Sequence, residues 1–247
     1  MGQKLSVNKK FFQLWSSEMA YILGFWFADG SVERSVSMRG HYVRVGSTEF
    51  KVISYIKKQM SAKHKIHKSI RPLKKSYYLL RIGDKQLFND LVFLGVVERK
   101  SNIMTFPNIP KKFIRYFILG YFDGDGCVYI EKNKDGSFKR LTTVFTSGSL
   151  VFLEQLRLVL SEQIGTSAVK KISETKSGSG AAAFQLRYSS HDSLNLYFYL
   201  YEMSKHPFCL RRKYSLFRKY IQSKNISINN LRHKNHLCGG KESFVEV

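Results

Sequence analysis

The chain contains the same unit twice, and this duplication restricts its fold more than any other feature of the sequence. Each copy opens with an apolar stretch that ends in Asp-Gly, at residues 20–30 (AYILGFWFADG) and again at 116–126 (YFILGYFDGDG). Similar spacing of apolar and polar residues continues after both stretches. We therefore expect two copies of one folding unit, related by a pseudo-twofold axis.

Apolar spacing predicts the same order of elements in both copies: helix, strand, strand, helix, strand, strand, helix. The second strand of each copy is expected to end at a serine, Ser47 or Ser147. The later helices are predicted near 49–60, 85–94, 149–163 and 191–203. The fold class is α+β: two pseudo-symmetric α-β-β-α-β-β-α repeats packed through their first helices, with antiparallel sheets. The expected divisions are a first half (1–104), a proline-containing linker (105–112), a second half (113–223) and a polar tail (224–247).

The charge of the chain points to a polyanionic partner. Lys and Arg number 41 against 18 Asp and Glu, which gives a net charge of +23. Self-repulsion of this size is best relieved by nucleic acid, with an anionic membrane surface as the weaker alternative. No apolar run approaches the roughly 18 residues of a membrane span, so a membrane is not expected. Three scattered cysteines predict a reducing intracellular compartment, a bacterial cytoplasm or an organelle matrix, without distinguishing the two.

Both repeated apolar helices are predicted to end in an aspartate, Asp29 or Asp125, followed by a glycine. The glycines, Gly30 and Gly126, fit a left-handed residue just past a helix. The aspartates do not fit locally, because a helix C-terminus carries partial negative charge and repels a carboxylate. Two such acids at equivalent positions therefore require a compensating cation.

A stripe of small residues runs along each of these helices: Ala20, Gly24 and Ala28 in the first, Gly120 and Gly124 in the second. Small residues at steps of four would let the two helices pack with their backbones close together. Their C-termini would then bring the two aspartates side by side, where like charges resist joint ionisation. A hard divalent ion such as Mg²⁺ would relieve that repulsion with oxygen ligands. Metal ions held by carboxylates beside a basic surface are equipment for phosphodiester hydrolysis.

These residues resemble the LAGLIDADG homing endonucleases, in the form that carries two motifs in one chain. The degenerate motifs are ILGFWFADG at 22–30 and ILGYFDGDG at 118–126, and the resemblance covers about residues 15–220. It implies a monomeric, site-specific endonuclease that cuts both strands of double-stranded DNA with Mg²⁺, for which Mn²⁺ or Ca²⁺ could substitute in binding. The first motif has Phe27 where the second keeps an acid, Asp123, which we expect to serve as a capping or outer acid.

The resemblance also implies roles for further residues. Asp29 and Asp125 would bind the metals, together with the backbone carbonyls of Ala28 and Gly124. The closing Arg-Lys pair of each half would supply a catalytic lysine, Lys100 or Lys213, with a register uncertain by two residues, where Glu98 and Arg211 stand. Ser47 and Ser147 would order the attacking water.

Basic and polar residues on the strands are expected to form a saddle across the major groove. Val43, Val45 and Leu80 would face the helices, whereas Arg44, Arg81 and Tyr78 would point outward. The predicted DNA contacts are Arg34, Arg44, Lys63, Lys65, Lys68, Arg71, Lys74, Lys75, Tyr78, Arg81, Tyr129, Lys132, Lys134, Lys139, Arg140, Lys170, Lys171, Gln185 and Arg187.

Two other functions use the same scaffold. An intron maturase would bind its own intron RNA as a splicing cofactor, with or without DNA cleavage. A DNA-binding protein that has lost catalysis is the third hypothesis. The two retained aspartates argue against this third hypothesis, because an inactive copy has no need of a repelling pair of acids. They do not separate the first two.

Overall fold

The computed structural model describes residues 5–35, 40–70, 75–96, 103–176, 182–203 and 208–227. The first half contains α1 (Ser17–Asp29), β1 (Gly30–Ser35), β2 (Gly40–Ser47), α2 (Phe50–Gln59), β3 (Ile66–Ser69), β4 (Tyr77–Gly83) and α3 (Lys85–Phe93). The second half contains α4 (Ile114–Asp125), β5 (Gly126–Lys132), β6 (Phe138–Ser147), α5 (Leu150–Ile164), β7 (Ile172–Lys176), β8 (Ala182–Tyr188), α6 (Ser190–Tyr197) and α7 (Arg211–Ser223). Along these residues, no helix combines the length and apolarity needed to cross a membrane.

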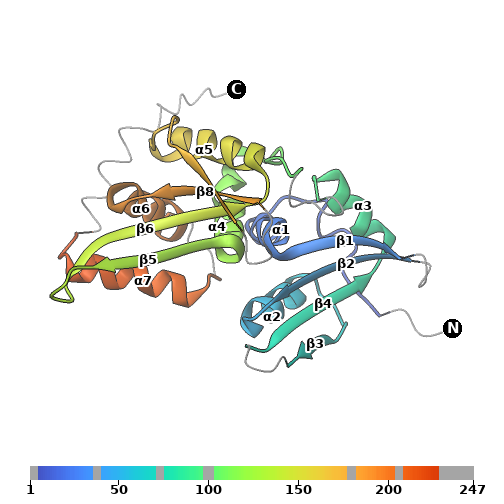
Figure 1. Cartoon of the computed structure of the whole chain (residues 1–247). Helices are drawn as coiled ribbons and strands as arrows, with labels where there is room; N and C mark the ends of the chain where they lie inside the picture. The colour runs from blue at the N-terminus through green and yellow to red at the C-terminus, as the bar shows by residue number, and fades with distance from the viewer. Residues whose placement is uncertain are drawn as a thin grey trace, which may run out of the picture.

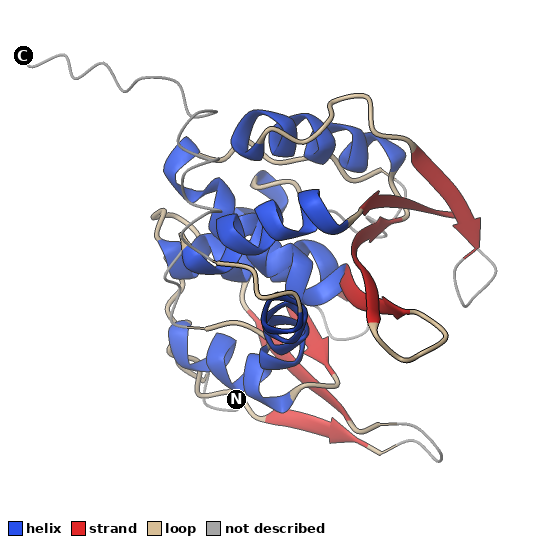
Figure 2. Cartoon of the chain, turned by 90° about the vertical axis from the view of Figure 1, so that its left-hand side faces the viewer, coloured by secondary structure: helices blue, strands red, loops and turns tan. Residues whose placement is uncertain are grey.

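Each half carries one antiparallel four-stranded sheet with the same topology, β1-β2-β4-β3 in the first and β5-β6-β8-β7 in the second. The two sheets lie on either side of the paired helices α1 and α4 (Figure 1). A view from the side shows the strands gathered toward one side of the molecule and the helices toward the other (Figure 2). The α+β class and the repeated unit predicted from the sequence are confirmed.

The two halves join through close contact between the backbones of α1 and α4. A Cβ added to Gly24 would lie 2.0 Å from the carbonyl oxygen of Phe117, and one added to Gly120 would lie 1.9 Å from that of Tyr21. The two contacts are equivalent under the repeat, as a pseudo-twofold axis between the helices requires. Only glycine lets the helices approach this far, so the predicted role of the small-residue stripe is confirmed at these two positions.

The glycines that follow the motif helices have a different role from the predicted one. Gly30 (φ −98°, ψ 167°) and Gly126 (φ −80°, ψ 154°) are extended, not left-handed, so that prediction is wrong. Each chain segment passes directly from helix into strand at these residues. A Cβ on Gly30 would lie 2.2 Å from Cδ1 of Trp26, and one on Gly126 would lie 2.1 Å from Cδ2 of Phe122. Glycine is required here because the large aromatic side chain of the last turn lies over it.

The second half has one more helix than the predicted unit. The segment predicted as a single helix near 191–203 is α6 followed by a short π-helix, Phe198–Glu202, and a separate helix, α7, follows it. Between the halves, residues 104–110 are not helical, as the two prolines of the linker predict, but the predicted linker ends in a 3₁₀-helix, Lys111–Phe113. The linker is fixed to α5, because the Phe106 N–H donates to Oε1 of Gln155 at 2.6 Å, and just before it the Met104 carbonyl accepts a hydrogen bond from Ser149 Oγ at 2.6 Å.

Candidate functional site

Asp29 and Asp125 are the last residues of α1 and α4, at the point where these helices meet. A Cβ on Gly124 would lie 2.2 Å from Cβ of Ala28 and 3.4 Å from Oδ2 of Asp29. The Asp29 carboxylate therefore lies beside the residue that precedes Asp125. Burial, followed by the charges of Asp125 and Asp29, raises the pKa of the Tyr121 hydroxyl well above its usual value. One buried tyrosine thus experiences both carboxylates, which places them in one electrostatic site.

Ser47 and Ser147 end β2 and β6, as predicted, and both are buried. Ser47 Oγ accepts the backbone N–H of Glu49 at 3.1 Å, and Ser147 Oγ accepts that of Ser149 at 3.0 Å. Both serines therefore shape the turn from strand to helix. Val45, two residues before Ser47, pairs with Gly30, so the serine lies level with the end of α1; Ser147 lies in the same way beside α4. Their role toward water stays a prediction.

Lys213 lies in the first turn of α7 and is only 1% exposed. Its ammonium donates to the carbonyl oxygens of Asp123 at 2.9 Å, of Gly126 at 2.5 Å, and of Phe122. These carbonyls form the C-terminal end of α4 and the start of β5. Burial lowers the Lys213 pKa to about 8, although the charges of Asp123 and Asp125 act in the opposite direction. Lys213 is therefore the cation that compensates the helix end in the second half.

Arg211 and Arg212, which precede Lys213, are exposed. The Arg212 guanidinium donates to Oε1 of Glu49, the residue that begins α2, at 3.0 Å and so connects the two halves. Arg211 lines a groove of about 830 Å³ at this junction. Lys100 and Glu98, the predicted counterparts in the first half, lie outside the described residues.

Asp123 is buried beneath the second motif, 1% exposed. Its Oδ2 accepts the backbone N–H of Leu210, at the start of α7, and the hydroxyl of Tyr21 from α1, both at 2.9 Å. Burial raises the Asp123 pKa to about 6, and Lys213, the Leu210 N–H and Tyr21 partly offset that effect. Asp123 is thus a capping acid, as the sequence predicted, and the hydrogen bond from Tyr21 links it to the other half of the chain.

Phe27, at the corresponding position of the first motif, forms apolar contacts instead. Its ring packs edge-on against Phe117 at 5.2 Å between centroids and lies 6.3 Å from the ring of Phe152. A Cβ on Gly95 would touch its ring at 3.5 Å. The same backbone position therefore contacts its neighbours through a hydrogen-bonded carboxylate in one half and through an aromatic ring in the other.

The outer face of the first sheet, away from the helices, carries arginines around one acid. Arg44 and Arg81 are paired across β2 and β4. Arg44 Nε donates to Ser31 Oγ at 2.8 Å, and both guanidinium groups lie near Glu33, at 3.7 and 3.5 Å. Arg81 also lies over the ring of Tyr42, 3.9 Å from its centroid. The predicted outward direction of both arginines is confirmed.

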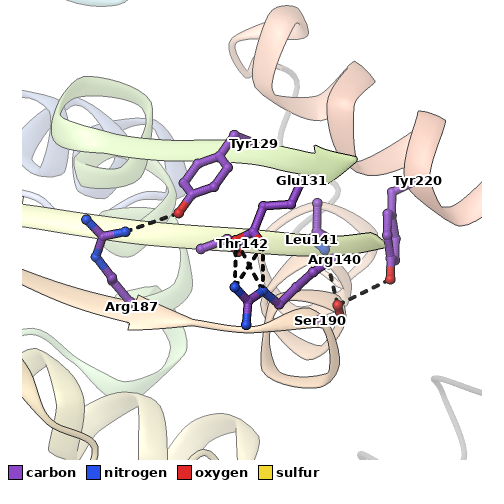
Figure 3. Close-up of polar contacts among 8 residues, drawn as sticks. All are labelled: Tyr129, Glu131, Arg140, Leu141, Thr142, Arg187, Ser190 and Tyr220. Atoms are coloured by element: carbon purple, nitrogen blue, oxygen red, sulfur yellow. Dashed lines mark hydrogen bonds and ion pairs between the residues drawn. The ribbon is translucent and has the colours of Figure 1, made fainter. Parts of the chain in front are cut away.

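The outer face of the second sheet carries a more extended polar network (Figure 3). Arg187 donates to the hydroxyl of Tyr129 at 3.1 Å and to Oε1 of Gln185 at 2.5 Å. Arg140 and Glu131 form a bidentate ion pair with its shortest contact at 2.8 Å. Because these side chains restrain one another, they have fixed positions along one surface of β5, β6 and β8.

Several predicted DNA contacts have other surroundings. Tyr78 points toward the helices and packs against Phe50, so its predicted outward direction is wrong; Arg81, three residues on, has the opposite direction. Arg34 lies over Phe88 of α3, 5.4 Å from the ring centroid. Lys170 forms an ion pair with Asp192 of α6 at 3.1 Å. Arg34 and Tyr78 therefore lie on the helix side. Lys170 also lines a pocket with Arg140 and Arg187 of the outer face, so it lies at the edge between the two faces.

Lys68 pairs with Tyr78 and shares its side of the sheet, although it is exposed. The other lysines that were predicted to contact DNA and lie within the described residues are exposed near strand ends and hairpins: Lys63, Lys65, Lys75, Lys132, Lys134, Lys139 and Lys171. Arg71 and Lys74 lie outside the described residues. Tyr77, which the sequence analysis missed, lies on the outer face with its hydroxyl 2.3 Å from a Cβ added to Gly46. Strand alternation counted back from Arg81 would have identified it.

The donors at the end of α1 and α4 suit a hard cation. Asp29 and Asp125 offer carboxylate oxygens, and Ala28 and Gly124 lie in the same last turns with backbone carbonyls. Within the described residues, no group of three or more His, Cys, Asp or Glu side chains could hold a metal. Mg²⁺ commonly uses one or two carboxylates and completes its shell with water and phosphate oxygens, so this small donor set fits it.

Comparison with known proteins agrees with this architecture. Residues 112–198 match the family model for a LAGLIDADG-like domain. No curated protein matches the sequence.

Among solved structures, the I-LtrWI LAGLIDADG homing endonuclease bound to target DNA is 12% identical, with a TM-score of 0.54 over 96% of this chain and 99% of that one. The I-GzeII enzyme in complex with a DNA target is 11% identical, with a TM-score of 0.51 over 92% and 99%. The I-SmaMI enzyme bound to cleaved DNA is 16% identical, with a TM-score of 0.53 over 93% and 97%. The chain thus carries a LAGLIDADG-like domain in its second half and has, over nearly its whole length, the fold of the LAGLIDADG homing endonucleases.

Proposed function

We propose that this chain is a site-specific endonuclease that hydrolyses one phosphodiester in each strand of a long DNA duplex. The observation that carries the proposal is the pair of aspartates at the joined ends of α1 and α4. Asp29 is exposed and Asp125 is partly exposed, so both can reach a ligand outside the protein. Two carboxylates held together resist joint ionisation unless a cation lies near them. Separately, the net charge of +23 is self-repelling unless a polyanion lies against it.

Mg²⁺, when bound between the two carboxylates, would supply a more acidic water and stabilise charge on the phosphate. The chain's own residues would do the rest. Asp29 and Asp125 would hold the cation at the ends of the two helices, and the fixed turns at Ser47 and Ser147 limit movement beside them. Mn²⁺ or Ca²⁺, which prefer similar oxygen ligands, would bind the same donors.

The outer faces of the two sheets would position the duplex. Arg44, Arg81 and Arg187 have planar guanidinium groups that suit guanine edges, and Gln185 suits adenine. Exposed lysines around these faces would contact phosphates and supply most of the affinity. Cys127 and Cys209 are free thiols, which suits a reducing intracellular compartment.

A selection from a randomised duplex library tests this function. The protein is incubated with the library in Mg²⁺, and newly formed ends are captured and sequenced. We expect one extended sequence, without strict palindromy, to be recovered with breaks in both strands. Recovery of no cleaved sequence, together with tight binding of a structured intron RNA, would replace the endonuclease with a maturase.

A further inference from the structure

Lys213 has no donor left for a substrate. A lysine ammonium has three N–H donors, and here three backbone carbonyls accept hydrogen bonds from it: those of Phe122, Asp123 and Gly126. Its side chain is 1% exposed, and the ammonium also lies over the Phe122 ring, 4.9 Å from the centroid. A group that donates directly to a phosphate or to an attacking water would need a free N–H and access to solvent.

Each of the helices α4 and α7 places a charged side chain at the end of the other. The C-terminal end of α4, which is partially negative, receives the cation of Lys213 from the first turn of α7. The N-terminal end of α7, which is partially positive, receives the carboxylate of Asp123 from the last turn of α4, through the N–H of Leu210 at 2.9 Å. We call this reciprocal arrangement of Asp123 and Lys213 the clasp. Its bonds flank Asp125 on both sides, at residues 122–123 and at 126.

In the first half, the position of Asp123 does not carry an acid. Phe27 occupies the position of Asp123 and packs against aromatic rings. At this position α1 is therefore held by apolar packing, which restrains position less specifically than hydrogen bonds between charged groups and backbone. The two motif helices therefore differ at the residue two positions before their aspartates.

We infer that Lys213 and Asp123 are positioning residues, which fix the backbone on both sides of Asp125 and thereby set the rate of cutting at one strand of the duplex. This inference rests on the proposed endonuclease function for its effect on cleavage, but the clasp itself does not depend on that function. It assigns Lys213 a role through the peptide carbonyls of α4 instead of the direct catalytic contact expected from the sequence.

The test uses the full chain with Lys213→Met, which keeps a similar stem and removes the donors. Hydrogen–deuterium exchange of the backbone is expected to rise about tenfold or more at residues 120–128, and to stay unchanged at residues 24–32. On a duplex labelled separately on each strand, cleavage of one strand should slow about tenfold more than that of the other, so that nicked duplex accumulates. Lys219→Met is the matched control, because Lys219 is an exposed lysine of the same helix; it should change neither readout.

Unchanged exchange at residues 120–128 in a folded Lys213→Met protein would overturn the inference, and so would equal slowing of both strands. If Lys213→Met does not fold, Asp123→Asn decides, because it keeps the size and removes the charge. Exchange should then rise at residues 208–215 and 120–128, and an unchanged pattern would overturn the clasp. If the wild-type chain cuts no duplex, the proposed function fails, while the exchange measurements still decide whether the clasp exists.

Discussion

The first and second halves meet at equivalent backbone contacts, but they hold the ends of the joined helices by different chemistry. Gly24 and Gly120 make the same close approach to the opposite helix. Below that contact, the second half has a buried carboxylate, Asp123, which accepts the N–H of Leu210, whereas the equivalent residue of the first half is Phe27, among aromatic rings. The shared feature is the one that brings two acids together. The differing contacts allow a substitution to change the surroundings of one motif helix without changing those of the other.

The outer faces of the sheets differ in the same way. Arg81 and Arg187 hold equivalent positions on β4 and β8. The neighbour of Arg81 on β2 is Arg44, whereas the neighbour of Arg187 on β6 is Val144. One sheet places two guanidinium groups side by side, whereas the other places a guanidinium group beside an apolar side chain. Because the two faces would contact different base edges, we predict that the two halves of a DNA target have unrelated sequences.

The largest expected effect is on cleavage, and it concerns the aspartate that ends the motif helix of each half. Asp29→Asn and Asp125→Asn should each reduce double-strand cleavage by at least about a hundredfold, since even the outer partners of metal ligands cost 10–100-fold. DNA affinity should hold or improve, because a negative charge near phosphates is removed. Cleavage of a labelled target and a binding titration measure the two effects. Near wild-type cleavage by either variant would separate that acid from the site.

A second comparison tests the symmetry of the helix contact. Gly24→Ala and Gly120→Ala each place a Cβ within about 2 Å of a backbone carbonyl oxygen, which cannot move as a side chain would. We expect both to lower the free energy of unfolding by about 3 kcal/mol, the upper range for overpacking. Urea unfolding measures it. A substantially smaller loss in one variant would show that the two contacts are not equivalent.

A third comparison uses pH to detect the buried acid of the second half. Burial raises the Asp123 pKa to about 6, against about 3.9 in an unfolded chain. Between about pH 4 and 6 the folded state therefore binds more protons than the unfolded state, and the stability contributed by this group falls as the pH rises. The total is about 3 kcal/mol.

Asp123→Asn should lack that component, so the difference in unfolding free energy between variant and wild type should change over this range and be constant above about pH 7. Denaturation at several pH values, without metal or DNA, measures it. The control is Phe27→Leu, which alters the corresponding position of the first half without a titrating group. A parallel pH dependence of Asp123→Asn and wild type would contradict a raised pKa at Asp123.

The smallest expected effects separate the two outer faces. Arg81→Ala should relax base preference at one position in one half of the target, and Arg187→Ala should do so in the other half, each by about 1–3 kcal/mol. Binding to single-substitution target libraries measures both. If the two variants relaxed the same half of the target, the assignment of one sheet to each half would be wrong.

Much of the fold could be predicted because apolar periodicity and repetition are local features. The α+β class, the helix from 85 onward and the inward Val43 and Val45 follow from spacing alone. Tyr78 was placed on the wrong face because the strand period was not counted strictly from Arg81. The π-helix at 198–202 was not predicted, because no proline or glycine marks the change from α6. The separate α7 was not predicted either, although Pro207 precedes it in the sequence and indicates a helix break.

The site was predictable only in part, for a physical reason. The paired acids stood out because a carboxylate at a helix C-terminus conflicts with the dipole. The burial of Lys213 could not be predicted, because the sequence shows that it follows two arginines but not which carbonyls it reaches. A lysine near an acid is compatible with catalysis or with capping, and three-dimensional contacts distinguish the two.

We propose that one chain builds one site from both of its halves. Mixing Asp29→Asn with Asp125→Asn protein in equal amounts, and measuring cleavage of the selected target in Mg²⁺ beside wild type, tests it directly. Each variant chain carries one altered acid, so a site formed within a chain is always defective. We predict that wild type cuts both strands and that the mixture does not. Restoration of double-strand cleavage in the mixture would contradict the account, because the two motif helices would then pair between chains.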